Sequence, residues 1–98
     1  MAKTIIPKRR IITRKENFIE IVAWKIPKSK FYPEGVKYSF AFINKDKRAI
    51  AFDNFNNEGH HRHFLNRKEH CQFKSLEDTL NQFFKLVEEF ESKGDEND

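Results

Sequence analysis

The chain contains a single cysteine and no long hydrophobic run. One thiol, Cys71, can neither close an internal disulfide nor form a zinc site made of cysteines. No uninterrupted apolar stretch approaches the roughly twenty residues needed to cross a bilayer, and the first residues lack the apolar segment of a secretory leader. We therefore expect a protein of the reducing cytoplasm that does not contact membranes.

Aliphatic residues are also scarce. Only 38% of the residues are hydrophobic and 35% are charged, but 11 are phenylalanine, so the core must be built from a few large rings. A chain of 98 residues has room for one hydrophobic core and not for two. We expect one domain over residues 1–94, followed by an acidic, disordered tail at residues 95–98.

Acidic residues are rare in the first three quarters of the chain. Residues 1–74 contain 17 Lys and Arg against 7 Asp and Glu, whereas residues 75–98 contain 2 against 8. A body with this much positive charge attracts polyanions, and RNA or DNA is the commonest such partner inside a cell. The alternative is ordinary solubilising charge, because net charge alone does not determine a function.

Two hairpins are expected in the first half of the chain. Residues Thr4–Ile12 and Asn17–Ile26 are rich in β-branched and aromatic residues and are joined by a short polar link. Pro7 places the first strand at a sheet edge or bulge, because proline donates no ladder hydrogen bond. Large and small residues alternate over 38–43 and 49–53, which indicates a second hairpin. A three-residue loop at 45–47 would pair Asn44 with Arg48 and put four core side chains on one face: Phe40, Phe42, Ile50 and Phe52.

The second half of the chain ends in a helix. His60–Leu65 fits either a short strand or an extended loop, whereas from Ser75 onward the apolar residues follow a helical period. Ser75 can cap the first turn and Gly94 marks the end. The fold class is therefore α+β: an antiparallel sheet of about four to five strands, in two hairpins, packed against one C-terminal amphipathic helix. The apolar stripe of that helix is Leu76, Leu80, Phe83, Val87 and Phe90.

Three histidines and an arginine are clustered at His60, His61, Arg62 and His63. Histidine titrates near neutral pH, so a pair can act as general base and general acid, and a guanidinium can stabilise a phosphoryl oxygen. Together these groups suit metal-free cleavage of RNA through its own 2′-hydroxyl, and we expect no cofactor.

Strand geometry limits the roles within this cluster. In an extended segment His61 and His63 share one face, and His60 and Arg62 take the other. The predicted acid–base pair is therefore His61 and His63, with Asp53 orienting a histidine. Arg62 would reach the phosphate only if the segment bends; otherwise Lys37, Arg48 or Arg67 takes its place.

Two other interpretations of the histidine cluster stay open. It could be a solvated polar loop, or alternate histidines could bind a metal with Asp53 or Glu58.

Basic and aromatic residues outside the cluster are candidates for binding nucleic acid. Phe31 and Tyr32 lie in a predicted loop and could stack bases, although such rings are often core residues. The basic candidates are Lys8, Arg9, Arg10, Arg14, Lys37, Arg48, Arg67 and Lys68.

Five segments together resemble the TumE-type family of toxin–antitoxin proteins: "AWKIPKS", "FYPEGVKYSFAFIN", "AFDN", "GHHRHF" and "FKSLEDTLNQFF". The resemblance runs from about Ile11 to Phe90. It implies a small toxin encoded beside a helix-turn-helix antitoxin, with ribonuclease or translation-blocking activity. The residues that match the shared elements are Asp53, Asn54, His61, Arg62 and His63, whereas an acidic residue often stands in place of His60 among relatives.

These observations together predict a metal-independent endoribonuclease toxin that cleaves cellular RNA and blocks translation. The expected partners are RNA and the antitoxin, and we also consider a homodimer. One alternative is a non-catalytic module that binds RNA or the ribosome through its basic face, for which binding would weaken steeply with salt. The other is a metal-dependent nuclease.

Overall fold

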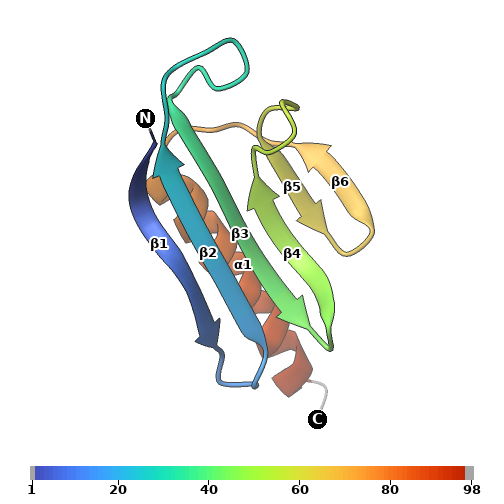
Figure 1. Ribbon diagram of the computed structural model, residues 1–98. Coiled ribbons are helices and arrows are strands. Elements are labelled where there is room, and N and C mark those ends of the chain that lie inside the picture. The colour runs from blue at the N-terminus through green and yellow to red at the C-terminus, as the bar shows by residue number, and fades with distance from the viewer. Residues whose placement is uncertain (1, 97–98) are drawn as a thin grey trace.

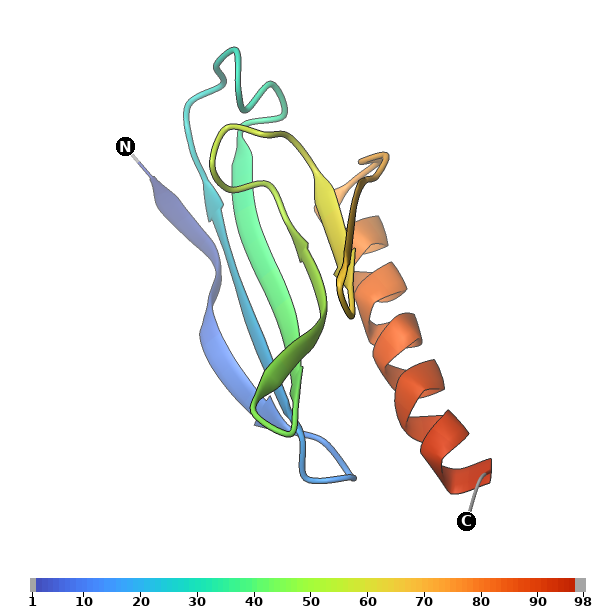
Figure 2. The same cartoon turned by 90° about the vertical axis from the view of Figure 1, so that its right-hand side faces the viewer.

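The computed structural model describes residues 2–96 and has two layers, a six-stranded antiparallel sheet and one helix (Figures 1 and 2). Neighbours in sequence are neighbours in the sheet, in the order β1-β2-β3-β4-β5-β6. No helix within residues 2–96 is long and apolar enough to span a membrane. The elements are β1 (Lys3–Ile12), β2 (Phe18–Lys25), β3 (Val36–Asn44), β4 (Lys47–Asp53), β5 (His61–Phe64), β6 (Arg67–His70) and α1 (Leu76–Glu96).

The predicted α+β class is confirmed, with six strands in place of four to five. The segment after the second hairpin forms a third hairpin, in which β5 pairs with β6. β6 reads "RKEH" and is exposed throughout, so it lacks the alternation of apolar and polar residues by which a strand is recognised. Pro7 lies in an edge strand whose register with β2 shifts on both sides of Ile6, as predicted for a proline.

The β3–β4 turn differs from the predicted three-residue loop. Asn44 pairs with Lys47 and not with Arg48, so the loop has two residues. Lys45 and Asp46 have φ of 52° and 64°, as in the primed turns that suit two-residue hairpins. One extra residue on β4, Ala49, then restores the alternation, because Ile43 pairs with Arg48 while Phe42 pairs with Ile50. The four predicted core residues, Phe40, Phe42, Ile50 and Phe52, therefore share a face and are at most 1% exposed.

The core lies between α1 and the centre of the sheet. Phe83 packs against Phe40 and Phe52 at ring-centroid distances of 6.0 Å and 6.3 Å, and Phe90 meets Phe42 edge-on at 5.4 Å. The apolar stripe predicted for the helix faces this core. The opposite face of the sheet is covered by no helix of the described chain (Figure 2).

Both ends of α1 are fixed by polar contacts. The Asp78 backbone N–H donates to Ser75 Oγ at 3.0 Å, which confirms the predicted cap. Near the other end Glu91, which is 7% exposed, accepts hydrogen bonds from Thr13 and from Asn17 of the β1–β2 turn. The helix continues to Glu96, past the predicted end at Gly94, and the last residues of the predicted tail, 97 and 98, lie outside the described residues.

Candidate functional site

The pairing of β4 with β5 decides on which side of the sheet each clustered residue lies. Asp53 is opposite His61 and Ala51 is opposite His63, whereas Phe52 is opposite Arg62. Directly opposed residues share a face, so His61, His63 and Asp53 lie on the side away from α1. We call that side of the sheet the open face. The prediction that His61 and His63 share a face, with Arg62 on the other, is confirmed.

His63 lies next to a carboxylate. Its Nε2 lies 3.4 Å from Asp53 Oδ2, and the two side chains are 20% and 13% exposed. The other carboxylate oxygen, Oδ1, accepts the backbone N–H of Phe55 at 3.1 Å, which fixes the orientation of Asp53. Burial lowers the pKa of His63, and Arg48 lowers it further against the opposing effect of Asp53. This shift favours the neutral form of His63, which is the form that a general base requires.

His61 is more enclosed than His63. It is 4% exposed, and its ring lies 6.4 Å from that of His63 and 4.9 Å from that of His70. Its Nε2 is 3.4 Å from Glu58 Oε2. Glu58 also accepts a hydrogen bond from Lys68, which lowers the pKa of this carboxyl. His61 thus connects His63 to a second carboxylate and a second cation.

A cavity of about 330 Å³ opens beside His63. His61 is not part of its lining and borders a neighbouring hollow, which shares Glu58 and Lys68 with this cavity. The cavity beside His63 brings together two predicted catalytic residues, Asp53 and His63, and two predicted basic residues, Arg48 and Lys68. The full lining is Ser39, Arg48, Asp53, Phe55, Asn56, Glu58, His63 and Lys68.

Two residues near the cavity were not predicted in these positions. Glu58 was considered only as a metal ligand, and His70 was given no role. His70 faces His61 through the pairing of β5 with β6, so recognition of that third hairpin would have found it. The sequence offers one sign of this hairpin, the polar residue Asn66 at its turn. In the structure the preceding residue of that turn, Leu65, has a φ of 55°.

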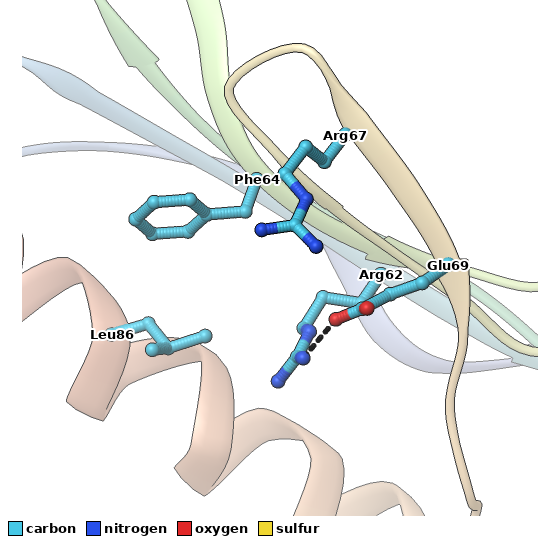
Figure 3. Close-up of a pocket in the computed structure, with 5 residues that line it drawn as sticks. All are labelled: Arg62, Phe64, Arg67, Glu69 and Leu86. Atoms are coloured by element: carbon cyan, nitrogen blue, oxygen red, sulfur yellow. Dashed lines mark hydrogen bonds and ion pairs between the residues drawn. The ribbon is translucent and has the colours of Figure 1, made fainter.

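Arg62 lies on the α1 side of the sheet (Figure 3). Its guanidinium pairs with Glu69 of β6, and its buried Nε has no hydrogen-bond partner among the described residues. With Phe64, Arg67 and Leu86 it lines a separate cavity of about 310 Å³ between the third hairpin and α1. Arg62 is therefore not among the residues that line the cavity at His63.

Asn54 and His60 connect the strands beside the cavity. Asn54 is 2% exposed; its Oδ1 accepts the Tyr38 backbone N–H at 3.0 Å and its Nδ2 donates to the Val36 carbonyl at 2.8 Å. His60 stacks on Phe73 at 4.3 Å, and its Nδ1 is 2.9 Å from the Tyr38 hydroxyl. Both side chains are engaged in these contacts and lie outside the lining of the His63 cavity.

The predicted nucleic-acid residues are divided between the two faces. Arg9, opposite Ile21, and Arg67 lie on the α1 side, and Arg14 is in the β1–β2 turn. The remaining five give the open face its positive charge: Lys8, Arg10, Lys37, Arg48 and Lys68. No group of three or more His, Cys, Asp or Glu side chains within residues 2–96 is arranged to hold a metal ion.

Comparison with known proteins identifies a family. The family model described as Toxin TumE matches residues 2–91, which is nearly the whole chain. No curated protein and no solved structure matches the chain.

Proposed function

This chain belongs to the TumE toxin family, the toxin components of toxin–antitoxin systems, and on that premise we propose that it is a metal-independent endoribonuclease. The observation that carries the proposal is the cavity on the open face, in which His63 lies 3.4 Å from the Asp53 carboxylate and beside two cations. Cleavage of cellular RNA at this cavity would block translation.

His63 is the general base in the proposed reaction. It takes the proton from a 2′-hydroxyl while Asp53 fixes the orientation of the ring. The 2′-oxygen attacks the adjacent phosphorus, and the bond from phosphorus to the 5′-oxygen breaks. His61 gives its proton to that leaving oxygen from the neighbouring hollow, which it lines together with Glu58 and Lys68. The products are a 2′,3′-cyclic phosphate and a free 5′-hydroxyl, and each histidine ends in the protonation state from which the other began.

Arg48 and Lys68 stabilise the negative charge that develops on the phosphoryl oxygens. Both line the cavity with His63, whereas Arg62 lies on the other side of the sheet. The role first expected of Arg62 is therefore assigned to these two cations. Charge stabilisation of this kind is often the largest single contribution to phosphoryl chemistry.

The test is incubation of the purified protein with total cellular RNA, with and without EDTA. We expect discrete fragments that carry 2′,3′-cyclic phosphate ends and persist in EDTA. His63→Ala should lower the rate roughly 10²- to 10⁴-fold, the usual contribution of a general base, and His61→Ala should also be slow. His60→Gln is the matched histidine control and should cleave normally, and thermal unfolding of each variant verifies its fold.

Two results would redirect the proposal. Intact RNA at every protein concentration would favour a non-catalytic module that binds RNA or the ribosome through the open face. Fragments that disappear in EDTA would favour a metal-dependent nuclease.

The family implies an antitoxin partner, and we propose that it is a helix-turn-helix protein acting on the toxin in the cytoplasm. An acidic segment of that protein would cover the positive charge of the open face. The protein encoded beside the toxin should then compete with RNA for binding, and simultaneous binding of both would contradict a shared surface. Sedimentation of the purified toxin distinguishes a monomer from the homodimer considered above.

A further inference from the structure

A groove of about 460 Å³ crosses the open face over β2, β3 and β4. Its volume lies within the roughly 300–1,000 Å³ of ligand pockets. Its charged lining residues are two cations and one carboxylate, Lys8, Arg48 and Glu20, and its other lining residues include Val22, Trp24, Ala41 and Phe55. Solvent-facing sides of antiparallel sheets are usually polar, so an apolar groove on this side indicates a binding site.

Small and aliphatic side chains of two strands and two aromatic rings line the groove. Val22 and Ala41 form the floor of the groove; they lie on neighbouring strands and are only partly buried. The small side chain of Ala41 leaves space above it. The rings of Trp24 and Phe55 stand beside this floor, with centroids 6.2 Å apart and planes inclined at 31°. Such a floor and wall can accept a flat ring that stacks on an aromatic side chain.

The groove and the cavity at His63 share a wall. Ser39, Arg48 and Phe55 line both, so a ligand can occupy the two spaces together. Two cations accompany the aromatic rings: Lys8 lines the groove, and the Lys37 ammonium is 4.8 Å from the centroid of the Phe55 ring. Aromatic rings within a positively charged groove are the usual means of holding single-stranded nucleic acid.

We infer that this groove is a subsite that stacks one base of single-stranded RNA on Trp24, next to the phosphate held at His63. The inference rests on the proposed function and names its substrate class. A duplex does not fit the requirement, because the faces of its bases are already stacked on one another, whereas an unpaired base can be splayed out onto a protein ring.

The chain offers a direct probe, because Trp24 is its only tryptophan. A single-stranded 2′-O-methyl oligonucleotide cannot be cleaved through its 2′-oxygen, so it reports binding independently of catalysis. We expect it to quench the fluorescence of Trp24 at low salt, and the matching duplex to leave that fluorescence unchanged.

Variants test the same contact by fluorescence polarisation of a labelled oligonucleotide. Phe55→Ala should weaken binding roughly 5- to 100-fold, the range for loss of one aromatic stacking partner. Ala41→Leu should also weaken binding, because the larger side chain fills the groove without removing an aromatic ring. Phe84→Ala is the matched control, because Phe84 is 37% exposed on α1, on the other side of the sheet from the groove, and its affinity should equal that of the unchanged protein.

The outcomes separate this inference from the proposed nuclease. Quenching by the single strand, without cleavage of natural RNA, would support the subsite and count against the nuclease. Binding without quenching, equal quenching by the duplex, or full affinity in both groove variants would overturn the subsite even if RNA is cleaved.

Discussion

Substitution of Asn54 by alanine should destabilise the protein strongly, although the family resemblance places this residue among the site residues. The amide of Asn54 is bonded to two backbone groups of β3, the Tyr38 N–H and the Val36 carbonyl. Asn54→Ala leaves both without these partners. An unsatisfied buried backbone group costs about 1–3 kcal/mol, and water can reach the carbonyl of Val36, which is only partly buried. We therefore expect a loss of about 2–4 kcal/mol in the free energy of unfolding.

Urea unfolding followed by the fluorescence of Trp24 measures this loss. Since domains of this kind have a total stability of about 5–15 kcal/mol, Asn54→Ala should remain folded in the cold and should still cleave RNA there. The matched control is Asn81→Ala on the exposed side of α1, where alanine is the better helix former and no loss is expected. Asn54→Asp keeps the acceptor for Tyr38 but turns a carboxylate oxygen toward the Val36 carbonyl, so it should also destabilise. A stable Asn54→Ala variant that no longer cleaves RNA would refute this reasoning and place Asn54 in the chemistry.

The pH dependence of cleavage should respond in opposite directions to two charge changes beside His63. A general base must be neutral, so activity is lost as the pH falls through the pKa of His63, which burial and then Arg48 lower and Asp53 raises. Arg48→Gln should therefore raise the pKa of His63 and move the acid limb of kcat/KM to higher pH, whereas Asp53→Asn should lower that pKa and move the limb to lower pH. The measurement is a pH–rate profile on a short RNA. Shifts in the same direction in both variants would contradict the assignment of His63 as the general base. Arg62→Met should keep cleavage and should change stability little, because the Arg62–Glu69 pair is exposed and surface ion pairs contribute little. A folded Arg62→Met variant without activity, judged by urea unfolding and RNA cleavage, would restore Arg62 to a catalytic role.

Local periodicity explains which parts of the fold could be predicted from the sequence. The alternation in β3 and β4 and the helical stripe that includes Phe83 and Val87 are properties of neighbouring residues, and they identify the elements and the core. The two-residue turn and the bulge at Ala49 compensate for each other, so the correct core face was predicted from an incorrect loop. Strand β6 was not predicted, because its charged side chains follow no pattern of burial.

The candidate site was predicted less completely because a pleated strand separates residues that are adjacent in sequence. His61, Arg62 and His63 form a dense cluster along the chain, but successive side chains of a strand point to opposite faces. The close contacts of His63 therefore come from other strands: Asp53 on β4 at 3.4 Å, and Lys68, its directly opposed neighbour on β6. A slip of β5 by one residue would reverse every face and exchange Arg62 for the histidines on the open face. The register between β4, β5 and β6 thus determines which side chains can act together, and that register depends on a hairpin that the sequence pattern does not reveal.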